Sequence, residues 1–189
     1  ELGVHINFAP VADINNNAQN PVIGMRSFGE NRNNVWHKTE MYIRGSLSEN
    51  VLPVAKHFPG HGDTDTDSHY ALPLISQDRT RLDSLELYPF KKLIEAGLPA
   101  IMVAHLNVKA LDSSGMPASL SAAVIDRYLK DSLKFNGLCF TDAMNMKGVT
   151  RGRERGEAEV AALLAGNDIL LFPEDIGQAI AKIKKAITL

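Results

Sequence analysis

Apolar residues along the chain form short runs that alternate with helical patterns. Runs with strand character begin near Val4, Val51, Ala100, Leu138 and Ile169, and a helical pattern follows each of them. This alternation predicts parallel strands joined by crossover helices, which is the α/β class. Strands as apolar as these are expected to be covered on both faces.

The helical segments have recognisable starts and stops. Asn33 to Ser48 carries apolar residues at four-residue spacing, so they share one helix face. Pro89 suits the first turn of a helix that ends at Gly97. Ser121 can cap a helix that ends near Gly137. Two more helices are expected over residues 157–165 and 175–188.

About five βα units in 189 residues indicate one domain over residues 1–189. Periodicity alone leaves two architectures open. An open doubly wound sheet explains five units, and so does part of a (β/α)8 TIM-type barrel, which in full needs about 250 residues.

Composition excludes several classes of protein. The chain is 44% hydrophobic and 22% charged with a net charge of -2, which argues against a nucleic-acid partner. No apolar run reaches the length of about 18 residues that a membrane helix requires. The single Cys139 excludes an intrachain disulfide. No signal segment is visible, but the chain begins inside strand-like sequence, so the compartment, cytoplasm or cell envelope, stays open.

Polar chemistry is concentrated in the stretch Val54 to Pro73, which reads V-A-K-H-F-P-G-H-G-D-T-D-T-D-S-H-Y-A-L-P. Pro59 and two nearby glycines exclude a continuous helix, so a loop of about twenty residues is expected, and loops of that length are usually functional. The polar residues of this stretch are His57, His61, His69, Asp63, Asp65 and Asp67.

Three interpretations of this loop compete. It can be a plain polar turn region. It can be a metal site, but the aspartates fail the calcium-loop pattern because Ser68 and Leu74 replace the required Gly and Glu. A zinc site on the three histidines stays open, although their spacing is not that of a helical pair. In the third interpretation Asp67 orients His69, which then transfers protons near neutral pH.

The run K-H-F-P-G-H-G followed by D-S-H resembles the signature of glycoside hydrolase family 3, in its bacterial β-N-acetylglucosaminidase (NagZ-type) branch, and the resemblance extends along nearly the whole chain. It implies a (β/α)8 barrel of which about five βα units are present here. The chain is then expected to be a portion of the catalytic barrel that lacks the amino-terminal strands, and a missing barrel half or an additional domain would complete it.

The resemblance also assigns roles to residues at the carboxyl ends of the strands, where barrel enzymes carry their chemistry. It implies that sugar hydroxyls are bound by Asp13, by Arg26 of the R-S-F-G segment, and by Lys56 and His57. Met144 and Met146 are expected near the acetamido group of the sugar, where Met144 is the predicted substrate contact.

Asp142 ends the apolar run G-L-C-F-T-D-A-M, and taken by itself it could be a helix cap or a turn residue. By resemblance it is the nucleophile of a retaining glycosidase. The same resemblance makes the pair Asp67 and His69 the acid/base group, in place of the second carboxylic acid that most glycosidases use.

The implied function is removal of terminal β-linked N-acetylglucosamine from glycans such as peptidoglycan fragments, with no metal and no cofactor. The implied partner is a small carbohydrate or muropeptide. Alternatives are a family 3 β-glucosidase, a non-catalytic sugar-binding module, a metal-dependent hydrolase and an enzyme that uses phosphate in place of water.

Overall fold

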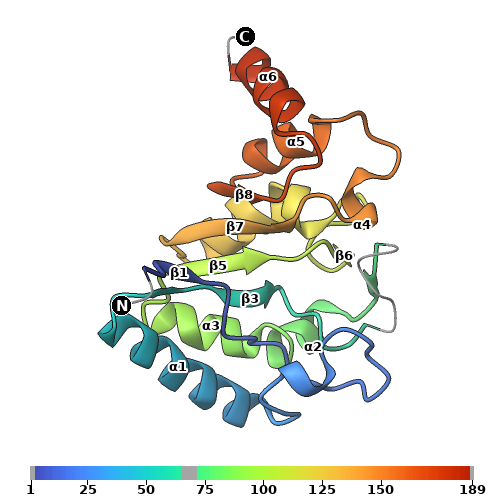
Figure 1. Cartoon of the computed structure of the whole chain (residues 1–189). Helices are drawn as coiled ribbons and strands as arrows, with labels where there is room; N and C mark the ends of the chain where they lie inside the picture. Colours follow the sequence, from blue (N-terminus) through green and yellow to red (C-terminus); the bar gives the residue numbers. More distant parts are fainter. Residues whose placement is uncertain (1–2, 65–71, 188–189) are drawn as a thin grey trace.

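The computed structural model describes residues 3–64 and 72–187, and it has an α/β architecture (Figure 1). The strands are β1 (Ile6–Asn7), β2 (Leu52–Pro53), β3 (Ala55–Phe58), β4 (Leu74–Ile75), β5 (Ala100–Val103), β6 (Asn107–Val108), β7 (Leu138–Ala143) and β8 (Ile169–Leu171). The helices are η1 (Gly24–Arg26), α1 (Arg32–Ser48), α2 (Arg79–Ser84), α3 (Tyr88–Glu95), η2 (Ala118–Leu120), η3 (Ala123–Ser132), α4 (Lys147–Thr150), α5 (Glu157–Leu164) and α6 (Ile176–Ile187).

The principal sheet is parallel and follows chain order. Its strands lie in the order β3, β5, β7, β8, and β1 pairs in parallel with β2 just before β3. A parallel bridge between Val11 and Lys56 continues the pairing of the first segment with β3. The five strand-like runs predicted from the sequence are therefore confirmed, and so is their parallel arrangement.

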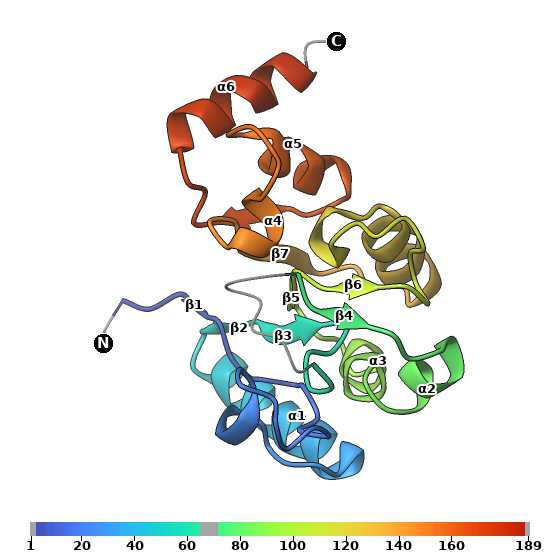
Figure 2. The same ribbon diagram turned by 90° about the vertical axis from the view of Figure 1, so that its right-hand side faces the viewer.

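The helices lie along one side of the curved array of strands. In Figure 2 the carboxyl ends of the strands face the viewer. The helices there form an arc from α1 through α3 and the yellow, unlabelled η3 to α5. The main apolar core fills the space between this arc and the sheet, and the rings of Phe58 and Phe90 meet there edge to face at 5.5 Å. Each fully buried large side chain of this kind contributes about 1.5–3 kcal/mol of hydrophobic stabilisation.

Local signals explain where the helices begin. The Asn31 side chain accepts hydrogen bonds from the first free N–H groups of α1, and Asp78 does the same for α2. Pro89 lies in the first turn of α3, as predicted. The helix predicted after Ser121 is present as η3, but several of its bonds span five residues, including Leu133 N–H to Tyr128 C=O.

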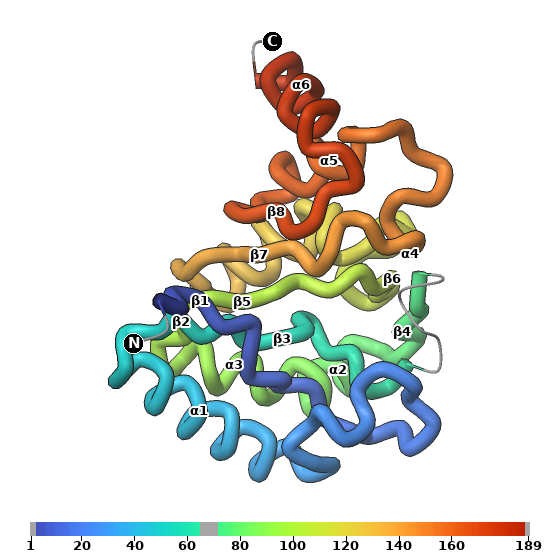
Figure 3. Tube along the Cα trace, viewed as in Figure 1, coloured from blue at the N-terminus to red at the C-terminus, as the bar shows by residue number. Residues whose placement is uncertain are grey.

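Two features of the fold concern the carboxyl ends of the strands. A separate small parallel pair, β4 with β6, lies at this end of the molecule (Figures 1 and 2). The segment of residues 12–31 and the segment of residues 57–64 also meet at this end (Figure 3). Over the part of the chain that the structure describes, no helix is both long and apolar enough to span a bilayer.

Candidate active site

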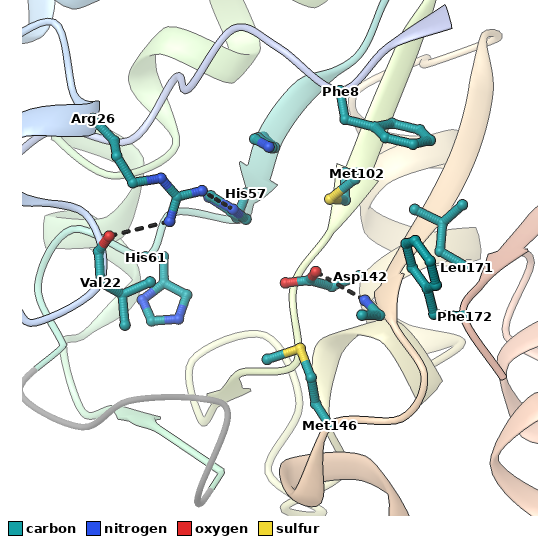
Figure 4. A pocket seen from close by; sticks show the side chains of 12 residues that line it. Phe8, Val22, Arg26, His57, His61, Met102, Asp142, Met146, Leu171 and Phe172 are labelled. Atoms are coloured by element: carbon teal, nitrogen blue, oxygen red, sulfur yellow. Dashed lines mark hydrogen bonds between the residues drawn. The ribbon is translucent and has the colours of Figure 1, made fainter. Parts of the chain in front are cut away.

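A cavity of about 220 Å³ opens at the carboxyl ends of the strands. Parallel strands all end at the same edge, so residues far apart in the sequence meet there. Figure 4 shows Arg26, His57 and His61 on one side of the cavity, Phe8, Leu171 and Phe172 on the other, and Asp142 between them. The lining residues are Phe8, Val22, Arg26, Lys56, His57, His61, Met102, Asp142, Ala143, Met146, Leu171 and Phe172.

Asp142 lies near the end of β7, where the register between β7 and β8 shifts between Phe140 and Ala143. Its Oδ1 accepts a hydrogen bond of 2.8 Å from the Ala143 N–H, which is its one recorded partner among the described residues. Burial by itself raises the pKa of Asp142, but the nearby His57 and the Ala143 N–H outweigh it and bring the pKa below its ordinary value. The carboxylate is therefore ionised at neutral pH and faces the cavity, as a nucleophile requires.

Arg26 reaches the cavity from the short turn η1. Its guanidinium donates to the Val22 carbonyl at 3.1 Å, and its second terminal nitrogen lies 3.4 Å from His57 Nε2. A planar fork of donors held at the rim suits the recognition of sugar hydroxyls. The placement agrees with the predicted binding role of Arg26, which stays a prediction.

Lys56 and His57 belong to β3 and both line the cavity. Burial and the neighbouring Arg26 lower the pKa of Lys56, whereas Asp142 and Asp13 oppose that shift. The imidazole of His57 is anchored from behind, because its Nδ1 lies 2.7 Å from Asp13 Oδ2. Since a carboxylate only accepts, Nδ1 carries the proton in this bond, and Nε2 can accept from Arg26.

Asp13 lies behind the cavity wall and is not among the residues that line it. It is fully buried, and its oxygens accept from the His57 N–H at 3.1 Å, the His57 ring and the His61 N–H at 2.7 Å. Burial raises the pKa of Asp13, but His57 and His61 outweigh it and the pKa is lowered. The expected direct contact of Asp13 with sugar does not fit this placement, because the carboxylate is already occupied in holding the strand end.

Met144 is also placed differently from the expectation. It is completely buried in a small core cluster with Leu120, Val149 and Ala162, away from the cavity. The turn that follows β7 instead brings Met146 to the cavity wall. Of the two methionines that the sequence singled out, Met146 is therefore the one in position to contact a ligand.

His61 lines the cavity, although its role was not assigned from the sequence. Its Nδ1 lies 2.8 Å from Thr64 Oγ1, and its ring meets that of His57 edge to face at 5.9 Å. Burial lowers the pKa of His61, which favours the neutral imidazole. The signal that could have found it is its place in K-H-F-P-G-H-G, four residues after His57.

The apolar lining could not be assigned from the sequence. Met102 and Leu171 belong to β5 and β8, and Phe8 and Phe172 directly follow β1 and β8. Each belongs to an ordinary apolar run, so nothing local distinguishes them from core residues. Only the fold brings them to one wall.

The predicted acid/base pair, Asp67 and His69, lies outside the described residues, so both roles stay predictions. The zinc alternative also depends on His69. Of its other two members, His57 has Nδ1 on Asp13 and His61 has Nδ1 on Thr64. Across residues 3–64 and 72–187 there is no cluster of three His, Cys, Asp or Glu residues with the arrangement of a metal site.

Comparison with known proteins places this site in a family. Residues 1–189 match the family model described as the glycosyl hydrolase family 3 N terminal domain. The chain therefore belongs to glycosyl hydrolase family 3, as its motifs predicted.

A curated relative, beta-hexosaminidase A of Pseudoalteromonas piscicida, is 38% identical over 91% of this chain, which spans 31% of that protein. A solved family 3 beta-N-acetylglucosaminidase from Paenibacillus sp. is 40% identical with a TM-score of 0.96, over 99% of this chain and 36% of the other. A solved beta-glucoside phosphorylase is 28% identical with a TM-score of 0.94, over 98% of this chain and 35% of the other. These similarities confirm the predicted fold class, an α/β fold that forms part of a (β/α)8 barrel.

Proposed function

We propose that the full-length protein containing this chain is a retaining exo-glycosidase that removes terminal β-linked N-acetylglucosamine. The observation that carries the proposal is the Asp142 carboxylate, which faces a cavity whose opposite wall presents Arg26, Lys56 and His57. An ionised carboxylate beside a cluster of hydroxyl-binding donors is the arrangement that nucleophilic glycoside cleavage needs. The beta-hexosaminidase and beta-N-acetylglucosaminidase relatives support this substrate class.

The proposed reaction has two steps. In the first, an Asp142 oxygen bonds to the anomeric carbon while the bond from that carbon to the leaving oxygen breaks, and His69 donates a proton to that oxygen. In the second, His69 takes a proton from water, the water oxygen bonds to the anomeric carbon, and Asp142 leaves. Asp67 is proposed to hold the His69 imidazole in the required orientation and to stabilise its cationic form.

The two walls of the cavity suggest how the sugar is oriented. Arg26, Lys56 and His57 supply donors for ring hydroxyls, and Met146 offers an apolar surface for the methyl of the acetamido group. The Asp142 carboxylate, the group proposed to attack the anomeric carbon, lies between the two sides of the cavity seen in Figure 4. Residues 1–189 are proposed to form part of the catalytic barrel domain, because they span only about a third of the relatives compared above.

The first experiment measures release of 4-nitrophenol from its β-N-acetylglucosaminide by the full-length protein, beside the corresponding β-glucoside. Faster cleavage of the N-acetylglucosaminide supports the proposal, and preference for the glucoside supports the β-glucosidase alternative. The similarity to a beta-glucoside phosphorylase also calls for a test of phosphate as the acceptor in place of water. Formation of sugar 1-phosphate in phosphate buffer, compared with a phosphate-free buffer, would support that alternative. Loss of activity with a chelator would support the metal-dependent alternative.

The acid/base role is tested with His69→Ala and azide. Azide is expected to accelerate the variant, because it attacks the glycosyl-enzyme without needing a general base, and the product is expected to be the β-glycosyl azide. No acceleration would remove His69 from the proposed role. A wild-type protein that binds N-acetylglucosamine without cleaving any glycoside would favour the sugar-binding module.

A further inference from the structure

A third buried histidine, besides His57 and His61, lies just behind the proposed nucleophile and outside the cavity. His105 follows β5, its side chain is fully buried, and it is not among the residues that line the cavity. Its Nε2 lies 3.0 Å from the Ala143 carbonyl oxygen, and its Nδ1 lies 2.6 Å from Ser119 Oγ. Both ring nitrogens are therefore in hydrogen bonds within the protein.

The partners determine which nitrogen carries the proton. A carbonyl oxygen only accepts, so Nε2 must be the protonated nitrogen. Nδ1 of the neutral ring then accepts from the Ser119 hydroxyl. Burial lowers the pKa of His105, which agrees with a neutral ring. This is the tautomer that a serine on Nδ1 and a carbonyl on Nε2 select.

The contacted residue, Ala143, is also the one that holds the nucleophile. Its N–H donates to Asp142 Oδ1 while its carbonyl accepts from His105. The register of β7 against β8 shifts between Phe140 and Ala143. The peptide that joins Ala143 to Met144 is held on both sides, because the Met144 N–H donates to the Leu171 carbonyl at 2.8 Å and the Ala143 carbonyl accepts from His105. A side chain that holds the Ala143 carbonyl therefore limits how the adjacent Asp142 carboxylate can turn.

Ser119 is itself held in place. Its N–H donates to the Ala104 carbonyl, and its carbonyl accepts from the Asn167 amide at 2.8 Å. Its side chain is fully buried. The chain of contacts from Ser119 through His105 to Ala143 thus joins three segments of the fold at the back of the nucleophile.

We propose that Ser119 and His105 form a positioning relay that holds Asp142 in line with the anomeric carbon. The relay rests on the proposed function, since it acts through the nucleophile. His105 is a positioning residue and does not touch the sugar. A displacement of a reacting group by about 1 Å can cost about 10²-fold in rate, so the effect is measurable in turnover.

Three variants of the full-length protein test the relay. His105→Leu removes the donor and is expected to lower kcat about 10²-fold, with the affinity for the product N-acetylglucosamine unchanged. His105→Gln keeps an N–H donor and is expected to recover part of that loss. Ser119→Ala removes the hydroxyl from Nδ1 and is expected to lower kcat about tenfold.

Leu129→Ala is the matched control, because Leu129 is fully buried in the main core and outside the cavity lining. It should lower the unfolding temperature while leaving kcat nearly unchanged well below that temperature. If His105→Leu lowers kcat no more than this control, or if His105→Gln gives no recovery, the relay is refuted.

A measurement that needs no turnover separates this inference from the proposed function. The ring nitrogens of His105, assigned in ¹⁵N spectra by comparison with His105→Gln, are expected to show the tautomer protonated at Nε2, and Ser119→Ala should perturb it. A ring protonated at Nδ1 overturns the relay whatever the activity. The expected tautomer in a protein that cleaves no glycoside would refute the proposed function and with it the positioning role.

Discussion

Two carboxylates at the strand ends, the fully buried Asp13 and the half-buried Asp142, have opposite relations to their surroundings. Asp13 is fully buried and accepts from the His57 N–H, the His57 ring and the His61 N–H. Asp142 has one recorded hydrogen bond among the described residues and faces the cavity. Neighbouring histidines contribute to a lowered pKa in both cases, against the effect of burial.

The difference shows that ionisation alone does not identify a reactive carboxylate. Both groups are ionised at neutral pH, but only Asp142 combines an ionised oxygen with access to a ligand. The hydrogen bonds of Asp13 hold the backbone at His57 and His61, whose side chains line the cavity. We therefore expect substitution of Asp142 to affect chemistry with little effect on stability, and substitution of Asp13 to affect stability first.

The largest effect is expected for Asp142→Asn. The variant lacks the proposed nucleophile but keeps a similar shape, so kcat should fall by at least about 10⁴-fold. Its free energy of unfolding should change by no more than about 1 kcal/mol, because a single hydrogen bond is affected. Turnover of the 4-nitrophenyl glycoside and urea unfolding measure the two quantities. Turnover near that of the wild type would move the nucleophile to another residue.

Asp13→Ala is expected to destabilise the protein by about 3–5 kcal/mol, because buried donors lose a charged partner. The lowered pKa of folded Asp13 also gives a pH dependence. Its contribution is fully present above the unfolded-state pKa of about 3.9 and is lost as the pH falls through the lower folded-state pKa. The stability gap between wild type and Asp13→Asn in urea should therefore narrow at acid pH. A difference in the free energy of unfolding between wild type and Asp13→Asn that does not change with pH would contradict a stabilising role of the ionised Asp13.

The two methionines after β7 offer a matched pair. Met144→Ala removes a fully buried side chain and should cost about 2–5 kcal/mol of stability, with little change in affinity for N-acetylglucosamine. Met146→Ala should weaken binding of N-acetylglucosamine more than binding of glucose, because only the former has the acetamido methyl. Calorimetric titration and thermal unfolding test the pair. If Met144→Ala weakens binding of N-acetylglucosamine and Met146→Ala does not, Met144 is the ligand contact.

Arg26→Lys is expected to have the smallest effect. Lysine keeps the charge but loses the planar fork of donors, so KM should rise about tenfold with little change in kcat or stability. Arg44→Lys, on the exposed side of α1, is the control and should leave KM unchanged. An unchanged KM in Arg26→Lys would exclude the guanidinium from sugar binding.

The sequence predicted the strands and most helices well, because each has a local cause. The apolar runs and the signals at Pro89 and Ser121 lie within the elements that they specify. The positions of Asp142, Lys56 and His57 at strand ends also followed from the strand pattern, and the structure brings them to one cavity. The barrel itself could not be chosen from periodicity, because an open sheet has the same pattern.

The remainder of the site depends on which way a side chain points after its strand ends. Met144 and Met146 are two residues apart and of one type, so the sequence does not say which one meets the cavity. Asp13 likewise follows a strand as an active-site acid would, but its depth is set by the pairing of residues 10–12 with Lys56. Such distinctions arise from contacts between segments more than 40 residues apart.

The sharing of one carboxylate by His57 and His61 has a consequence for engineering the site. Mutational libraries often vary such residues independently, on the assumption that their effects add. Here Asp13 accepts from the ring and the N–H of His57 and from the N–H of His61, and the two imidazole rings meet at 5.9 Å, so epistasis between the two positions is expected. A new substrate preference at this wall should be sought by varying the three positions together, with Asp13 as the residue that sets which combinations fold.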